Sequence, residues 1–129
     1  MSALVHVDMA YLRDVSNDDP REMQKLSQLY VRTMNAQLKK LERAIADHQC
    51  KNVEQIAHGA AGSSAVIGMK AVVPSLKEME NLGATGDLRR GADVLSDIRH
   101  AFSDICHFLD AHELLKKPSG RLDAIPERE

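Results

Sequence analysis

A long run of regularly spaced apolar residues, from Pro20 to about Asp47, limits most strongly what this chain can fold into. The spacing of three or four residues is typical of one buried stripe on an α-helix, and it is kept by Met23, Leu26, Tyr30, Met34, Leu38, Leu41 and Ile45. Asp18 or Asp19 can accept hydrogen bonds from the free amides at the helix start, and Pro20 suits the first turn. We therefore predict one long amphipathic helix here.

Sparse glycine and proline residues divide the rest of the chain into further helices. We predict helices over residues 7–13, 51–67, 70–82 and 87–112. Gly68 is expected to end the second of these, and Pro74 must lie in or near the first turn of the third because it would break a helix interior. Residues 83–87 read as a turn. The last helix has an apolar stripe of Leu88, Ala92, Leu95, Ile98, Phe102, Ile105 and Leu109.

Short connections make successive helices antiparallel neighbours. The expected fold is therefore all-α, an up-down-up-down antiparallel four-helix bundle with a short extra N-terminal helix. We expect this domain to cover residues 1–115. Residues 116–129 are charged and poor in apolar side chains, so we predict a disordered tail there.

Composition narrows the class of protein. The chain has 129 residues, of which 43% are hydrophobic and 28% charged, as in ordinary globular domains. A formal net charge of −2 and no clustered basic patch give little support for nucleic-acid binding. No apolar segment approaches the roughly 18 residues that a membrane span needs. With neither a signal peptide nor a disulfide framework, since only Cys50 and Cys106 are present, we expect a cytoplasmic protein.

The helix predicted over 51–67 displays one histidine beside a glycine. On an ideal helix that places Val53 in the core, His58 lies roughly 140° away and Gly62 roughly 180° away. His58 should therefore be exposed, above a patch where Gly62 contributes only backbone. An exposed neutral imidazole can act as a nucleophile, and a bare turn lets a second protein approach it. The same residues also fit a surface histidine without a role and a glycine that allows close helix packing.

The other histidine and cysteine residues do not form a pattern typical of a metal or nucleotide site. His100 and His107 are two helical turns apart, too far to share one metal ion, and His48 with Cys50 lacks two further ligands. We expect no metal site. No glycine-rich phosphate loop or kinase nucleotide motif is present, so the chain should not phosphorylate itself from ATP.

The run His58-Gly59-Ala60-Ala61-Gly62-Ser63-Ser64-Ala65-Val66-Ile67-Gly68 resembles the signature of histidine-containing phosphotransfer (HPt) domains. Glu80-Asn81-Leu82-Gly83 is similar to the end of the following helix in that family. Val7-Asp8-Met9-Ala10-Tyr11-Leu12 and the Asp19-Pro20 helix start resemble its opening. The resemblance thus extends over roughly residues 7–112 and agrees with the four-helix prediction.

The resemblance implies that His58 accepts and donates a phosphoryl group. The implied partners are a response-regulator receiver domain and an upstream hybrid sensor histidine kinase, with Mg²⁺ supplied by the receiver and none bound by this chain. We expect a monomer, a covalent carrier rather than a self-phosphorylating enzyme. Partner docking is assigned to Gln55, Gly59, Ala61, Gly62 and Ala65. A structural role is assigned to Ser63, Ser64 and Gly68; Ser64 also falls on the buried stripe, where its hydroxyl can bond the preceding turn.

Two positions depart from the family pattern. Members commonly have a lysine where this chain has Ala61, and some have a basic residue at the position of Ala84. Both cations would lie near a phosphoryl group that is about doubly negative. Lys77, expected roughly opposite His58, is a candidate substitute, although it also fits a solvated surface lysine. The missing cations leave an alternative function open, a regulatory module that docks a receiver or kinase and sequesters it without efficient transfer.

Overall fold

The computed structural model describes residues 6–116 of the chain, and they are helical nearly throughout. In chain order the helices are α1 (Met9–Val15), α2 (Pro20–Ala46), α3 (Cys50–Val66), the single 3₁₀ turn η1 (Lys70–Val72), α4 (Val73–Thr85) and α5 (Gly91–Ala111). The predicted all-α class is confirmed. The predicted tail over 116–129 lies, apart from Lys116, outside the described residues.

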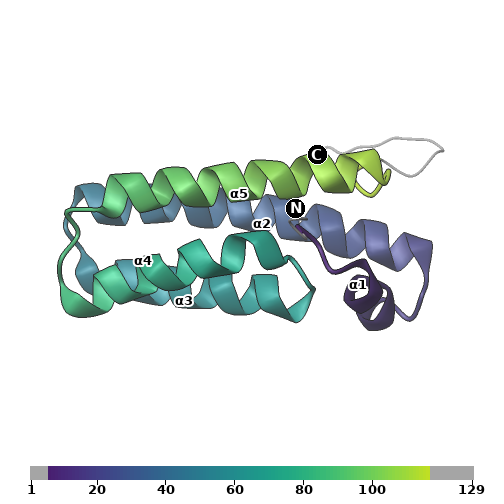
Figure 1. Ribbon diagram of the computed structural model, residues 1–129, viewed down its shortest axis with the longest axis horizontal. Helices are drawn as coiled ribbons and strands as arrows, with labels where there is room; N and C mark the ends of the chain where they lie inside the picture. The colour runs from purple at the N-terminus through teal and green to yellow at the C-terminus, as the bar shows by residue number, and fades with distance from the viewer. Residues whose placement is uncertain (1–5, 117–129) are drawn as a thin grey trace, which may run out of the picture.

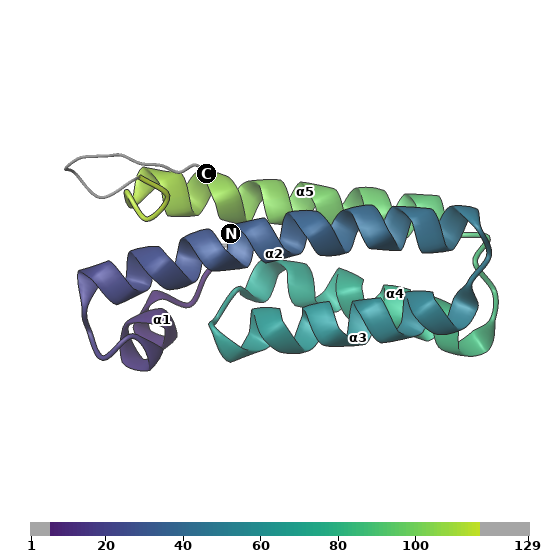
Figure 2. The ribbon, with the colours of Figure 1, turned by 180° about the vertical axis from the view of Figure 1, so that it is seen from behind.

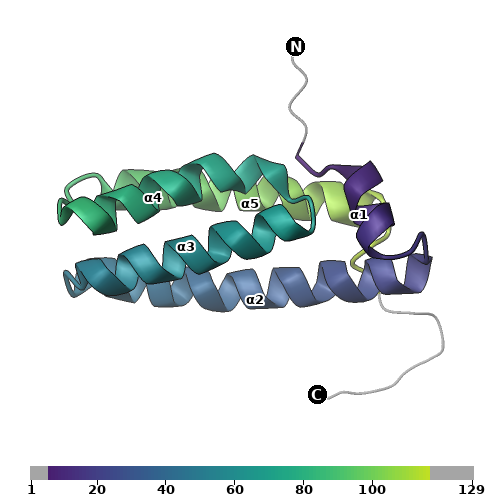
Figure 3. The ribbon, with the colours of Figure 1, turned by 90° about the horizontal axis from the view of Figure 1, so that it is seen from below.

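Helices α2 to α5 run alternately up and down as one antiparallel bundle (Figure 1). Seen from behind, α2 and α5 form one layer while α3 and α4 form the other (Figure 2). The short α1 lies across the end of the bundle where α2 begins, as the view from below shows (Figure 3). No helix within residues 6–116 is both long and apolar enough to cross a membrane.

The starts of α1 and α2 are fixed by acidic side chains that cap them. The side chain of Asp19 accepts the amide of Arg21 at the start of α2, with Pro20 in the first turn as expected. The side chain of Asp8 does the same for Tyr11 at the start of α1. That backbone hydrogen bond is also the main reason that the pKa of Asp8 is lowered. Because Asp8 is the capping residue, helix α1 starts at Met9, two residues later than the predicted start of 7–13.

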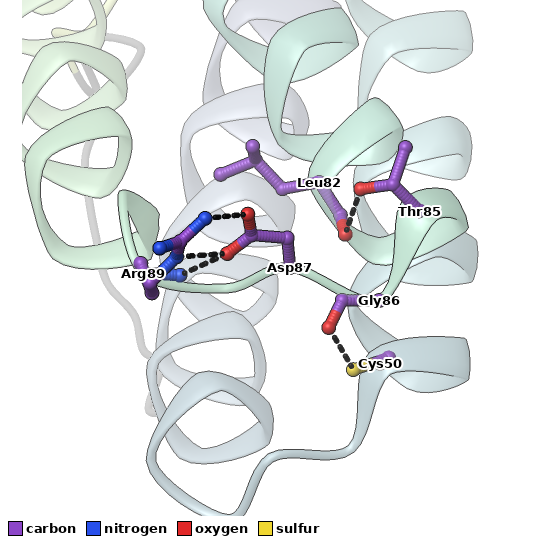
Figure 4. A network of polar contacts seen from close by, with 6 residues as sticks. All are labelled: Cys50, Leu82, Thr85, Gly86, Asp87 and Arg89. Carbon is purple, nitrogen blue, oxygen red and sulfur yellow. Dashed lines mark hydrogen bonds and ion pairs between the residues drawn. The ribbon is translucent and has the colours of Figure 1, made fainter.

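The prediction of a turn over residues 83–87 is wrong, because α4 continues to Thr85 and is capped by Gly86 in a left-handed conformation, with φ of 81°. The loop that follows is held by Asp87, whose side chain accepts bonds from Arg89 at 2.7 and 2.9 Å (Figure 4). These bonds lower the pKa of Asp87 to about 2. Because residues 87–90 form this loop, α5 starts at Gly91 rather than at residue 87.

Gly83 lies inside α4 because the helix touches α3 there. A methyl group built on Gly83 would lie 2.5 Å from the amide nitrogen of Glu54 and 2.7 Å from the carbonyl oxygen of Cys50. The backbones of α3 and α4 can therefore approach only where a residue has no side chain. The thiol of Cys50 points to the carbonyl of Gly86 across the same contact, at 3.7 Å (Figure 4).

The core is aliphatic and fills the space between the four long helices. Its largest fully buried side chains are Leu12, Met34, Leu41, Met69, Leu76, Met79, Ile98, Ile105, Leu109, Val53, Val72 and Val94. The apolar stripe predicted on α2 supplies much of it, although Leu26 and Ile45 are only partly buried. This packing fixes α3 and α4 as neighbours, and that pairing builds the site.

Candidate functional site

His58 stands on the outer surface of α3, as its helical phase predicts. Its side chain is 76% exposed. The core residues Val53, Ala57, Ala60 and Ser64 occupy the opposite side of the helix and are buried. The imidazole is therefore presented to solvent from a rigid segment with both ends of the helix well away from it.

Glu80 of α4 is the polar partner of this imidazole. Its Oε2 atom lies 2.9 Å from Nδ1 of His58, and its side chain is 28% exposed. A carboxylate only accepts hydrogen bonds, so in the neutral ring the proton must be on Nδ1. Nε2, the outer nitrogen, then keeps its lone pair. Two other histidines bond through Nδ1, but to backbone carbonyls: His100 to Ser96 and His112 to Phe108.

Sequence reasoning missed the role of Glu80. It expected Lys77 to lie roughly opposite His58, whereas Glu80 occupies that place. Lys77 lies three residues earlier on α4 and is exposed, which puts it next to Glu80 on the helix surface. The antiparallel pairing of α3 and α4 could have indicated that a residue of α4 faces His58. Which residue does so depends on how the two helices are aligned, and that alignment depends on the contact at Gly83.

The surface beside His58 is open. A methyl group built on Gly62 would have no neighbouring atom within 4 Å, and the same holds for Gly59. Gln55 and Ala65 are exposed as well. These four residues lie where a docking partner can reach them.

Ala61 does not belong to this surface. Only 3% of it is exposed, and the phase of residue 61 turns it toward α4, the side from which Glu80 reaches His58. The assignment of Ala61 to partner docking is therefore wrong. Its place in the α3–α4 contact also means that a lysine there would have to extend along α4 to reach solvent.

Behind the histidine turn, a buried hydrogen-bond chain ties α3 to α2. The hydroxyl of Ser64 donates to the carbonyl of Ala60 at 2.8 Å, which is the bond predicted for it, and lies 2.8 Å from the hydroxyl of Tyr30. Since Ser64 uses its hydrogen for Ala60, the Tyr30 hydroxyl donates. Burial raises the pKa of Tyr30. Ser63, by contrast, is exposed and forms no side-chain hydrogen bond within the described part of the chain, so no structural role is seen for it.

Gly68 closes the far end of α3. Its φ is 82°, and a methyl group there would lie 3.0 Å from the carbonyl oxygen of Asp8. The amide of Asp8 in turn donates to the carbonyl of Gly68 at 2.8 Å. A residue without a side chain is needed for both reasons, so Gly68 holds the N-terminal segment against the end of α3.

The other candidates contribute no site. Across residues 6–116, no group of three or more histidine, cysteine or acidic side chains is arranged to hold a metal ion. Cys106 is half-buried and burial raises the pKa of its thiol. The chemistry available here is therefore that of one exposed imidazole nitrogen, oriented by a carboxylate and approachable across bare backbone.

Comparisons with known proteins agree with this geometry. The Hpt domain family matches residues 25–116. Among solved structures, histidine-containing phosphotransfer protein B (HptB) from Pseudomonas aeruginosa PAO1 is similar in fold, with a TM-score of 0.79 and 20% sequence identity over 90% of this chain and 100% of that chain. No curated protein sequence matches.

Proposed function

The chain belongs to the Hpt domain family and is a histidine phosphotransfer protein of a two-component phosphorelay, and we propose that His58 is the residue that carries its phosphoryl group. The observation that supports this proposal most directly is the pairing of Nδ1 with Glu80, because it leaves Nε2 as the free nucleophile on a 76% exposed ring. Hpt domains work with receiver domains and kinases, so the proposed donor is the aspartyl phosphate of one receiver and the proposed acceptor is the free aspartate carboxylate of another.

The proposed transfer needs few groups from this chain. The Nε2 lone pair attacks the phosphorus of a receiver's aspartyl phosphate, an N–P bond forms, and the bond from phosphorus to the aspartyl oxygen breaks to release the carboxylate. Attack leaves positive charge on the ring while Nδ1 keeps its proton. The carboxylate of Glu80 lies where it offsets that charge and accepts the Nδ1 hydrogen bond throughout, as the acid of a catalytic triad does. Transfer to the next receiver is the reverse reaction.

The partner supplies what this chain lacks. We propose that Mg²⁺ and the acidic pocket belong to the receiver and that an upstream hybrid sensor kinase carries the donor receiver. Gln55, Gly59, Gly62 and Ala65 would lie under the docked receiver. Lys77, which is exposed one turn from Glu80 on α4, would be a cation of this chain available to the phosphoryl group. We further propose a monomer in the cytoplasm, where free thiols such as Cys50 and Cys106 are the rule.

The test is transfer of label from a purified, phosphorylated receiver domain. Acid-labile, base-stable label should appear on the wild type and be absent from His58→Gln. His100→Gln is the matched control, because His100 is also exposed on a helix and also bonded through Nδ1. Label on His58→Gln would refute the assignment. Binding of the receiver without any label would support the sequestering module, which an oriented and exposed nucleophile does not favour.

A further inference from the structure

The turn of α3 that precedes His58 carries two polar side chains, one on each side of the imidazole. These side chains are Glu54 and Gln55. On an ideal helix, Glu54 lies roughly 40° from His58 in one direction and Gln55 roughly 60° from it in the other. The backbone of Glu54 faces α4, because a methyl group built on Gly83 would lie 2.5 Å from its amide nitrogen. Gln55 therefore lies on the flank of His58 that is turned away from α4.

The bond to Glu80 directs Nε2 of His58 toward that same flank. Glu80 reaches Nδ1 from α4 at 2.9 Å, and the two nitrogens of an imidazole lie on opposite sides of the ring carbon Cε1. When Nδ1 faces α4, Nε2 faces away from it. A side chain on a helix also leans over the turn that precedes it. A phosphoryl group carried on Nε2 would therefore be closer to Gln55 than to Glu54.

The amide of Gln55 is available to bind such a group. The side chain is exposed, and none of the side-chain hydrogen bonds within residues 6–116 involves it. Residues three apart on a helix are surface neighbours, with Cβ atoms about 5–6 Å apart. A glutamine amide offers two N–H donors, and a phosphoryl group has three acceptor oxygens and about two negative charges.

No other side chain of this stretch of α3 can serve in the same way. Residues 54–62 read Glu-Gln-Ile-Ala-His-Gly-Ala-Ala-Gly, so Gln55 is the one residue among them, apart from His58 itself, with a side-chain donor. A carboxylate such as that of Glu54 only accepts hydrogen bonds and would repel the phosphoryl group. The donor and the free ring nitrogen thus lie on the same flank of one helix.

Building on the proposed function, we infer that Gln55 is a phosphoryl-binding residue, whose side-chain amide donates a hydrogen bond to the phosphoryl group on Nε2 of His58. In the unphosphorylated chain this amide is exposed to water. Phosphorylation gives it a charged acceptor, and hydrogen bonds to charged acceptors are the stronger ones. Gln55 therefore stabilises the phosphorylated state relative to the unphosphorylated one. This role differs from docking, because the contact exists in the phosphorylated chain without a receiver.

The equilibrium constant of the transfer distinguishes the two roles. The reaction moves the phosphoryl group from the receiver's aspartate to Nε2 of His58, with the P–O bond breaking as the P–N bond forms. Its equilibrium constant at fixed pH depends only on the free reactants and products. A residue that touches only the docked receiver therefore changes the rates of both directions by the same factor and leaves the equilibrium unchanged. A residue that binds the phosphoryl group changes the equilibrium constant itself.

The experiment measures the share of label on the chain at equilibrium with the receiver domain that labels His58 in the experiment above. We expect the equilibrium constant for phosphorylation of the chain to fall about fivefold in Gln55→Ala, as for loss of one exposed hydrogen bond. It should fall further in Gln55→Glu, which repels the phosphoryl group, and rise in Gln55→Lys, whose ammonium group donates and carries positive charge.

The matched controls are Ser63→Ala, Ser63→Glu and Ser63→Lys. Ser63 is exposed on the same helix, but its position is roughly 140° around the helix from His58. These variants should stay within about twofold of the wild type, because a charge there is screened by solvent. Phosphorus NMR of the chain labelled by phosphoramidate checks the contact without a receiver. The phosphohistidine signal should shift in Gln55→Ala and keep its position in Ser63→Ala.

Two results would overturn the inference. The first is an equilibrium constant that is the same in Gln55→Ala, Gln55→Glu and the wild type; a lower second-order rate constant in those variants would then assign Gln55 to docking alone. The second is an equal shift in the Ser63 variants, which would assign the effect to the general charge of α3. If neither a receiver nor phosphoramidate labels His58 at all, the proposed function itself has failed.

Discussion

The Nδ1 atom of His58 and the Oε2 atom of Glu80 lie 2.9 Å apart, so a hydrogen bond between an imidazole of α3 and a carboxylate of α4 joins the two helices at the site. Glu80→Ala removes the group that holds the proton on Nδ1. We expect the neutral ring to populate both tautomers and the transfer rate to fall about tenfold, the lower end of the loss usual for the orienting partner of a functional imidazole, since this pair is partly exposed. Nitrogen NMR of the ring and the maximal transfer rate measure the two effects.

Glu80→Gln separates orientation from charge. Its amide oxygen still accepts the Nδ1 hydrogen bond but does not offset positive charge on the ring. A tautomer ratio like that of the wild type with a reduced transfer rate would assign the charge a role in the reaction. Glu78→Gln is the control, because Glu78 is on the same helix and is bonded to Arg90 instead. If Glu80→Ala leaves both the tautomer and the rate unchanged, Glu80 does not position His58.

Side chains introduced at Gly62 should stabilise the fold but reduce the access of the partner to His58. Since a methyl group there meets no atom within 4 Å, Gly62→Ala should raise the free energy of unfolding by up to about 1 kcal/mol, the helix preference of alanine over glycine. Gly62→Gln should also fold well, yet obstruct the partner and lower the second-order rate constant of transfer by about tenfold or more. Phosphorylation of both variants by the small donor phosphoramidate should stay at the wild-type rate. Slow labelling by phosphoramidate would mean that the imidazole itself had been disturbed.

Periodicity and capping residues predicted the helices of this fold, and the phase of His58 predicted its exposure. These features depend on local sequence. The role of Glu80 and the burial of Ala61 depend instead on which flank of α3 the next helix covers and at what register. That register is set by the contact of Gly83 with the backbone of α3, and a glycine near a helix end is equally typical of a turn.

Gly83→Ala should lower the free energy of unfolding, whereas Gly62→Ala should raise it. Its methyl group would collide with backbone atoms of Glu54 and Cys50 at 2.5 and 2.7 Å, and backbone cannot rotate away as a side chain can. We expect a loss of about 1–3 kcal/mol in the free energy of unfolding, measured by urea denaturation. Separation of α3 from α4 should also weaken the His58–Glu80 bond, so the nitrogen NMR signals of the ring should shift as in Glu80→Ala. Wild-type stability would show that the two backbones are not in close contact.

The buried pair Tyr30 and Ser64 should couple when mutated. Tyr30→Phe leaves Ser64 bonded to Ala60 and should cost about 1 kcal/mol, whereas Ser64→Ala leaves the Tyr30 hydroxyl buried without an acceptor and should cost about 1–3 kcal/mol. A double-mutant cycle by urea denaturation should therefore give a non-zero coupling energy. Strict additivity would mean that the two hydroxyls do not bond.

The same tyrosine gives a pH dependence with a definite sign. Burial raises the pKa of Tyr30 above its ordinary value of 10.0, so the folded state holds the phenolic proton more tightly than the unfolded state. Its contribution to stability is complete below pH 10 and is lost as the pH rises above that value. We expect the urea midpoint of the wild type to fall more steeply above pH 10 than that of Tyr30→Phe. Parallel curves for the two proteins would contradict a raised pKa.

The cation missing at position 61 can be restored. Ala61 is packed toward α4, so the chain of a lysine there would run along α4 and bring its ammonium group to the surface near Glu80 and His58. Ala61→Lys should cost some stability through overpacking and lengthen the lifetime of phosphohistidine at neutral pH, because the phosphoryl group is about doubly negative. Lys77→Gln should shorten that lifetime if Lys77 already serves the phosphoryl group. Lys51→Gln, which removes an exposed lysine of α3, is the control for net charge. Lifetimes that are the same in Ala61→Lys, Lys77→Gln and the wild type would show that no cation of this chain supports the phosphoryl group, and that its stabilisation comes from the partner.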